Sequence, residues 1–177
     1  MIKFVETQVI PKSIILSPLF CFSKKRLFEE VADCAGYVLD KPAKEIVAAL
    51  NKRESYGTTV FFPGIAIPHA VIDSKHETFA ILSILDKPIT FNSIDADEQL
   101  IDIALCLFIS KNDDEAKVES LLKDLTIVLA DNELLNALRL AKNETSKLAT
   151  LLNKIDYILD KPKEINSDWN DQLMEQI

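Results

Sequence analysis

The sequence predicts a single α/β domain, and three observations support this fold class. The chain has 177 residues, about the length of one domain, and 48% of them are hydrophobic, enough for one sizeable core. Apolar runs typical of strands alternate with the three-and-four spacing typical of helices. No internal repeat or linker divides the middle of the chain. We therefore expect one domain over residues 1–159 and a polar tail over residues 160–177.

Strand-like segments are expected first, over residues 1–22, with a turn at Pro11-Lys12. Ser23 then begins a helix, because its side chain can cap the free backbone N–H groups of the first turn. The apolar positions of this helix follow at helical spacing: Leu27, Phe28, Val31, Ala32, Ala35, Val38 and Leu39. A second helix begins after Lys41-Pro42 and ends around Arg53–Gly57.

The next segment is rich in β-branched and aromatic residues and predicts two short strands. They lie over Thr58–Phe62 and Ile65–Ile67, on either side of a turn at Pro63-Gly64. Pro68-His69 is expected to leave the second of these strands, and Asp73–Glu77 to form a polar loop.

Two longer strands are expected over Phe79–Leu85 and Ile101–Ile109, joined by an acidic connector at Asp95–Glu98. The second of them is almost continuously apolar, which indicates a strand covered on both faces.

The pattern becomes helical from Asp113 onward. An apolar stripe at three-and-four spacing predicts a long helix through Val118, Leu121, Leu122, Leu125, Val128 and Leu129. Two further helices are expected over Glu133–Ala141 and over Glu144–Leu152 or slightly beyond.

Charge and scarce residues exclude several kinds of site. With 28 acidic and 20 basic residues the net charge is −8, which disfavours a general nucleic-acid binder. Three scattered glycines exclude a Walker A loop and a G-x-G-x-x-G fingerprint. Two histidines and no C-x-x-C argue against structural zinc, so we expect no metal and no cofactor. The three separated cysteines, Cys21, Cys34 and Cys106, are interpreted as reduced thiols.

No targeting segment is recognisable, and no apolar run approaches the length of about 20 residues that spans a bilayer. We therefore expect a protein of the cytoplasm without a membrane segment. A homodimer is left open, since the sequence assigns no surface to it.

The segment from Arg53 to His69 contains the residues with the clearest chemical potential. Pro68 constrains the chain direction into His69, whose unprotonated ring nitrogen would be a nucleophile at neutral pH. A phosphohistidine also needs a group that fixes the opposite nitrogen and donors for the phosphoryl oxygens. Arg53 could supply a guanidinium, and Ser55, Thr58 and Thr59 could supply hydroxyls. Composition alone, however, favours a structural role for a lone histidine.

The order and spacing of these residues resemble the active-site signature of EIIA domains of the phosphoenolpyruvate-dependent phosphotransferase system. The branch is the fructose/mannitol type, which includes the nitrogen-regulatory (PtsN-like) EIIA proteins. The matching segments are Arg53-Glu54, Gly57-Thr58-Thr59 and Gly64-Ile65-Ala66-Ile67-Pro68-His69. Leu85–Phe91 and Leu121–Leu138 also look like family segments, so that the similarity runs roughly from Ser13 to Leu152.

The resemblance implies a mixed β-sheet flanked by helices and leaves the status of an enzyme open: the chain would be a phosphohistidine-carrying component of the phosphotransferase system rather than a free-standing enzyme. It implies that His69 accepts a phosphoryl group from an HPr-like carrier protein, with Arg53 stabilising the phosphate and Thr59 orienting it or the histidine. It also places Glu54 in the site, with Ser55, Gly57, Thr58, Gly64 and Pro68 as supporting residues. Nitrogen-regulatory members control protein partners by phosphorylation state, whereas sugar-specific members pass the group to an EIIB cysteine. No EIIB or membrane segment is present, so a regulatory EIIA is expected.

Two departures from the family pattern stand out. The stretch Val60–Pro63 is bulkier than the glycine-containing stretch of many relatives. Val118 stands where many relatives have a second histidine near the first, and valine can neither orient an imidazole nor donate to phosphate. These departures motivate the alternative of an EIIA-like binding module that no longer relays phosphate.

Other interpretations of the polar residues stay open. Arg53 and Glu54 are neighbours on a helix and point in different directions, so Glu54 could anchor structure, or both could be surface residues. His76 is interpreted as a solvated loop residue, and Asp113-Asp114-Glu115 as a helix N-terminus. A metal-dependent hydrolase has little support, because the two histidines lack helical H-E-x-x-H spacing.

Overall fold

The strands of the described part of the chain form one mixed, seven-stranded sheet. The computed structural model describes residues 2–5, 12–92 and 99–160. The strand order is β1-β2-β6-β7-β4-β3, with β5 also paired to β7. The strands are β1 (Ile2–Val5), β2 (Ser13–Leu16), β3 (Val60–Phe62), β4 (Gly64–Ala66), β5 (His69–Ile72), β6 (Phe79–Asn92) and β7 (Gln99–Ser110). The connector predicted at Asp95–Glu98 and the tail beyond Asp160 lie outside the described residues, and the predicted domain boundary stays a prediction.

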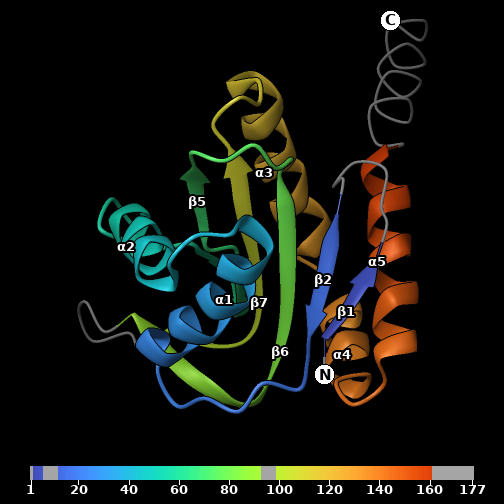
Figure 1. Cartoon of the computed structure of the whole chain (residues 1–177). Helices are drawn as coiled ribbons and strands as arrows, with labels where there is room; N and C mark the ends of the chain where they lie inside the picture. The colour runs from blue at the N-terminus through green and yellow to red at the C-terminus, as the bar shows by residue number, and fades with distance from the viewer. Residues whose placement is uncertain (1, 6–11, 93–98, 161–177) are drawn as a thin grey trace, which may run out of the picture.

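Helices cover both faces of this sheet, as Figure 1 shows. On one face lie α1 (Lys24–Leu39) and α2 (Ala43–Glu54), whose buried residues share a hydrophobic cluster with the sheet. On the other face a second cluster joins the sheet to α3 (Glu115–Leu129), α4 (Asn132–Leu140) and α5 (Thr145–Asp160). The predicted fold class, an α/β domain with a mixed sheet flanked by helices, is confirmed.

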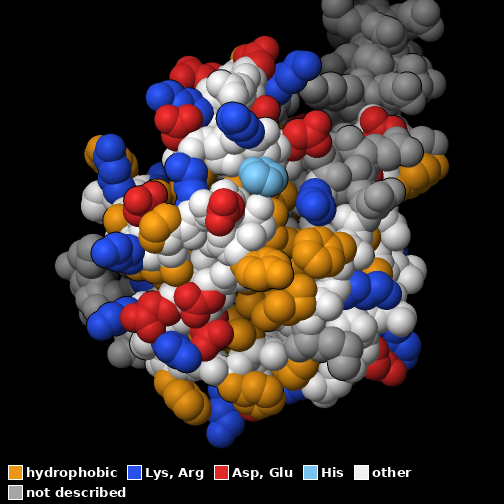
Figure 2. Space-filling model, viewed as in Figure 1, with side chains coloured by type: hydrophobic (Ala, Val, Ile, Leu, Met, Phe, Trp, Pro, Cys, Tyr) orange, Lys and Arg blue, Asp and Glu red, His pale blue; other side chains and the backbone are white. Residues whose placement is uncertain are grey.

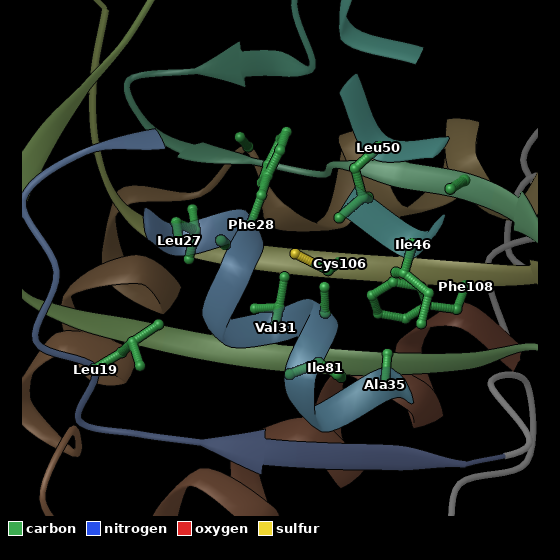
Figure 3. Packing of buried hydrophobic residues seen from close by; sticks show 14 of the residues in the cluster. Leu19, Leu27, Phe28, Val31, Ala35, Ile46, Leu50, Ile81, Cys106 and Phe108 are labelled. Atoms are coloured by element: carbon green, nitrogen blue, oxygen red, sulfur yellow. The ribbon is translucent and has the colours of Figure 1, made fainter. Parts of the chain in front are cut away.

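The central strand β7 contributes alternately to the two cores. Ile101, Ala104, Cys106 and Phe108 belong to the cluster under α1 and α2. Ile103, Leu105, Leu107 and Ile109 belong to the cluster under the later helices. Figure 3 shows Leu27, Phe28 and Val31 of α1 packed over the sheet near Cys106. The prediction of a strand buried on both faces is therefore confirmed, because successive side chains of a strand point to opposite faces.

Two elements are longer than predicted. β6 continues past Leu85 to Asn92, with a register shift against β7 between Ile84 and Ile89. Pro88 lies in this irregular stretch, where a strand tolerates a missing backbone donor. α5 continues past Leu152 to Asp160, because Ile155 and Leu159 keep the buried stripe going.

The connection between α1 and α2 is tight. Ser23 caps α1 as predicted, accepting a hydrogen bond from the backbone N–H of Arg26. The helix ends at Leu39, and its C-cap residue, Asp40, has a left-handed φ of 52°. A Cβ at Gly36 would lie 2.7 Å from the carbonyl oxygen of Lys41, so only glycine fits there without a shift.

His69 owes its position to two consecutive pairings along one edge of β7. β4 runs parallel to β7 at Ile101–Ala104, and β5 runs parallel to it at Leu107–Ser110. Pro68 lies between them, and its carbonyl accepts a hydrogen bond from the Leu107 N–H at 2.9 Å. Pro68 and His69 follow the end of β4, as expected, but the sequence did not predict that His69 begins a further strand, β5, which forms because β7 is long enough to pair with both segments.

The cysteines carry free thiols, as expected for reduced residues. Cys21 and Cys106 are buried, and Cys34 is half-buried. Burial, helped by the Glu30 charge, raises the pKa of the Cys21 thiol to about 11. Such a thiol is protonated at neutral pH and a poor nucleophile. Within the described ranges, no helix is both long and apolar enough to cross a membrane.

Hydrophobic side chains gather on the surface near α1 and β1 (Figure 2). A cavity of about 350 Å³ there is lined by residues that include the exposed Ile2, Phe4 and Tyr37.

Candidate functional site

The tautomer of His69 follows from its two hydrogen bonds. Nδ1 lies 2.9 Å from the carbonyl oxygen of Ile67, which can only accept, so Nδ1 carries the proton. The Nε–H of Arg53 donates to Nε2 at 3.0 Å, so Nε2 carries no proton and its lone pair accepts this hydrogen bond. The nucleophilic nitrogen of the ring therefore points toward Arg53.

Arg53 is held in place at the end of α2. Its Nη1 donates to the carbonyl oxygen of Gly57 at 2.8 Å while its Nε reaches His69. Gly57 has a φ of 145° and open space where a side chain would stand, so its glycine is required by the backbone and not by packing. Ser55 is exposed, and its hydroxyl donates to the carbonyl oxygen of Lys52. Ser55 thus caps the C-terminal end of α2.

Glu54 points away from Arg53 and joins different partners, as the helix geometry predicted. Its carboxylate pairs with Lys24 Nζ at 3.2 Å and accepts the Thr59 hydroxyl proton. Its side chain is only 5% exposed, which excludes the alternative of a surface residue. Glu54 thus connects α1 and α2 to Thr59, the residue that precedes β3.

The two threonines before β3 use their hydroxyls within the fold. Buried Thr59 donates to Glu54, and Thr58 donates to Gln99 Oε1 at 3.1 Å. The backbone N–H of Ile67 donates to the Thr59 carbonyl oxygen, which fixes this segment beside the residues that lead into His69.

A cavity of about 290 Å³ opens beside His69. Its lining comes from α2, the segment around β3, β5 and α3, and comprises Arg53, Thr58, Thr59, Val60, Phe61, Ile67, His69, Leu122, Lys123 and Thr126. The bulky stretch noted in the sequence forms strand β3 and the turn after it, and its first two residues help line this cavity.

Two residues of the family pattern lie elsewhere. Val118 is half-buried against the core beneath α3 and lines a separate cavity of about 740 Å³ near the start of that helix. Gly64 has a φ of 90° and lies against the guanidinium of Arg139, which pairs with Asp102 at 2.6 and 3.0 Å. Neither residue lines the cavity beside His69.

Sequence reasoning missed Lys24 and Lys123. Lys24 lies 30 residues before Glu54, and Lys123 lies on a helix that follows the whole sheet. No local spacing connects either of them to the motif. Only for Lys24 did the sequence offer a signal. Lys24 follows the capping Ser23 and therefore begins α1, which lies near α2, the helix of Arg53 and Glu54.

Residues set aside in the sequence behave as interpreted. His76 is exposed and contacts Ser74 in its own loop. Asp114 caps α3, accepting a hydrogen bond from the Ala116 N–H at 2.9 Å. Among the residues that the structure describes, no three His, Cys, Asp or Glu side chains group as metal ligands would.

The pKa of the His69 imidazole is lowered from its ordinary value. Burial is the largest cause, because it disfavours the charged ring, and the Arg53 guanidinium adds repulsion. The bond to Ile67 and the charge of Glu54 act in the opposite direction. The balance keeps the ring neutral and Nε2 available as a nucleophile.

His69 is therefore expected to stay mostly neutral at about pH 6.5, where an ordinary histidine is half protonated. The unfolded chain takes up this proton near pH 6.5 and the folded chain only at lower pH. The free energy of unfolding should thus fall as the pH falls below about 6.5. An NMR titration of the imidazole signals, assigned with the variant His76→Asn, measures the midpoint. A His69 midpoint at or above about 6.5 would contradict the prediction.

Comparison with known proteins agrees with the resemblance seen in the sequence. The family model described as "Phosphoenolpyruvate-dependent sugar phosphotransferase system, EIIA 2" matches residues 8–154. A nitrogen regulatory protein of Escherichia coli (strain K12) is 30% identical over 142 residues, which are 78% of this chain and 83% of that protein.

Solved structures share the fold. The nitrogen regulatory protein IIA-Ntr from Neisseria meningitidis has a TM-score of 0.65 at 22% identity, over 76% of this chain and 91% of that one. Enzyme IIA-mannitol of E. coli, solved in complex with phosphorylated enzyme IIB-mannitol, has a TM-score of 0.61 at 16% identity, over 78% and 92%. The chain belongs to the EIIA 2 family of the phosphoenolpyruvate-dependent sugar phosphotransferase system.

Proposed function

We propose that His69 of this phosphotransferase-system protein accepts a phosphoryl group at Nε2 from an HPr-like carrier protein. One observation carries the proposal. The Nδ1 proton is held by the Ile67 carbonyl oxygen, so the lone pair at Nε2 is directed at the cavity's guanidinium. An imidazole with its opposite nitrogen fixed in this way is prepared for nucleophilic attack.

The transfer balances without any further reactant. The hydrogen bond from Arg53 to Nε2 breaks first. The Nε2 lone pair then forms the new bond to phosphorus, and the bond from phosphorus to the donor's imidazole breaks. The electron pair of that bond stays on the donor's nitrogen. No proton has to leave His69, because its one ring proton is on Nδ1. Arg53, 3.0 Å from Nε2, then lies beside the phosphoryl oxygens.

Phosphorylation of the purified protein tests the acceptor. Incubation with phosphoenolpyruvate, the general phosphotransferase enzyme and HPr is expected to add one acid-labile phosphoryl group, detected by intact-protein mass spectrometry. His69→Ala should abolish this addition, whereas His76→Ala, which alters the exposed histidine, should leave it unchanged. An undiminished addition in His69→Ala would overturn the assignment. No addition to the wild type, in a reaction that labels a related EIIA, would favour the binding module that has lost phosphate relay.

We further propose that the phosphorylation state of His69 regulates protein partners in the cytoplasm. The similarity to nitrogen regulatory proteins along most of the chain supports this branch. The changed charge at the cavity supplies a physical basis, because a phosphoryl group adds close to two negative charges where the unmodified cavity is cationic.

A sugar-specific role is the second candidate, supported by the likeness to enzyme IIA-mannitol, which was solved with its phosphorylated IIB partner. In that role a cysteine thiolate of an EIIB domain would attack the phosphorus, and the bond to Nε2 would break. Mixing the phosphorylated protein with purified EIIB domains separates the two roles. Transfer of the label to a cysteine favours the sugar-specific role, and retention of the label with phosphorylation-dependent partner binding favours regulation.

A further inference from the structure

The cavity beside His69 is positively charged in an otherwise acidic protein. Its charged lining residues are Arg53 from α2 and Lys123 from α3, and no carboxylate of the described chain lines it. The whole sequence has a net charge of −8, so the charge of the cavity lining is opposite in sign to the net charge of the chain. Opposite charge within contact distance is what holds an anion in a partly enclosed space. The volume of about 290 Å³ equals that of roughly ten water molecules, ample for a phosphoryl group.

The hydroxyl groups of the cavity already donate elsewhere. Thr58 donates to Gln99 Oε1 at 3.1 Å, and Thr59 donates to Glu54. Thr126, on the α3 side, donates to the backbone carbonyl oxygen of Lys123 at 2.6 Å. A hydroxyl has a single proton to donate. The three threonines therefore cannot donate to a phosphoryl group while these bonds persist.

The side-chain N–H donors that remain belong to the two cations. In the unmodified protein Arg53 uses Nε for His69 and Nη1 for Gly57, which leaves its Nη2 group; bonding of Nε2 to phosphorus would release the Nε–H as well. The ammonium of Lys123 forms no hydrogen bond or salt bridge within the described part of the chain. Its three protons are thus available to a ligand in the cavity.

We propose that the Lys123 ammonium is the second cation that binds the phosphoryl oxygens when His69 is phosphorylated. This inference rests on the proposed function of His69. Both residues line the cavity, Arg53 from α2 and the exposed Lys123 from α3. Lys123 exchanges no proton and forms no covalent bond; it stabilises the charge that the transferred group brings to the site. Val118 occupies the position at which many relatives have a second histidine, and it lines a different cavity. The second cation, Lys123, comes instead from a later turn of the same helix, α3.

Variants of the two lysines on α3 provide a matched test. Lys123→Met removes the charge and keeps the apolar length of the side chain, and Lys123→Arg restores a charged donor. Lys117→Met makes the same change on an exposed lysine that lines the other cavity. Each protein is phosphorylated once by HPr and once by phosphoramidate, and the initial rates are compared. With phosphoramidate, Nε2 bonds to phosphorus, the phosphorus–nitrogen bond of the reagent breaks, and ammonia leaves, so no docked protein donor is required.

We expect Lys123→Met to lower both rates about tenfold, the value of one charge-assisted hydrogen bond. Lys123→Arg should recover most of the loss, and Lys117→Met should stay within about twofold of the wild type. A loss seen only with HPr would mean that Lys123 docks the carrier, and would overturn the proposal. Equal rates for Lys123→Met and the wild type would overturn it as well. A wild type that neither donor labels would instead overturn the proposed function of His69.

Discussion

Replacing Arg53 by methionine is expected to slow phosphorylation of His69 about a hundredfold, the usual cost of removing one preorganised donor from charge that develops in a transition state. The Arg53 guanidinium lies 3.0 Å from Nε2 and is oriented by the carbonyl oxygen of Gly57 at 2.8 Å. The donor that fixes the ring before attack therefore becomes the neighbour of the transferred group. The initial rate of labelling by HPr at saturating concentration measures the effect.

Two further variants sharpen this test. Arg53→Lys should recover only part of the rate, because an ammonium has no planar fork with which to contact His69 and Gly57 together. Lys52→Met removes the neighbouring exposed cation, which does not line the cavity, and should leave the rate near that of the wild type. A rate for Arg53→Met within about threefold of the wild type would show that Arg53 has no part in transfer.

Replacing Glu54 by alanine is expected to lower the free energy of unfolding by about 2–3 kcal/mol, somewhat less than for a fully buried ion pair because Lys24 is partly exposed. The carboxylate is 5% exposed and Lys24 is 23% exposed, at a separation of 3.2 Å. Its removal leaves the Lys24 ammonium, which lies 4.6 Å from the Phe91 ring centroid, without an anion. It also leaves the buried Thr59 hydroxyl without its acceptor. Urea unfolding followed by circular dichroism measures the difference.

A double-mutant cycle separates the ion pair from the rest of this effect. Adding Lys24→Met to Glu54→Ala should restore part of the stability, because the unpaired ammonium is then absent. Glu29→Ala breaks an exposed pair with Arg26 on α1 and is expected to cost less than about 0.5 kcal/mol. If Glu54→Ala were no less stable than Glu29→Ala, the interpretation of Glu54 as an anchor between α1, α2 and Thr59 would be wrong.

The element order was predictable because its signals are local. Ser23 caps α1, Asp114 caps α3, and the apolar periods of both helices are visible within about four residues of each position. The ends of β6 and α5 were underestimated, since what extends them is pairing with β7 and burial against the sheet. Those interactions involve residues that are distant in the chain.

In the candidate site, too, local features could be predicted and features that depend on distant residues could not. The motif from Arg53 to His69 was recognisable from residue types and spacing, and so was the divergence of Arg53 from Glu54 on one helix. The sequence did not predict that Gly64 and Val118 lie outside the lining of the His69 cavity. Residues on one strand or helix share a sequence motif even when they face different parts of the molecule, so motif membership alone does not define a cavity.

The α/β fold class, the helix caps, the apolar faces and the histidine that follows a Pro-containing motif could all be predicted from the sequence, because each depends on neighbours within a few residues. Three features depend on how the elements pack: His69 begins β5, its Nε2 accepts a hydrogen bond from Arg53, and Lys123 lines the same cavity. The physical reason is that strand pairing and helix packing join segments tens of residues apart. Their outcome depends on how all the apolar faces are buried together, which no local pattern encodes.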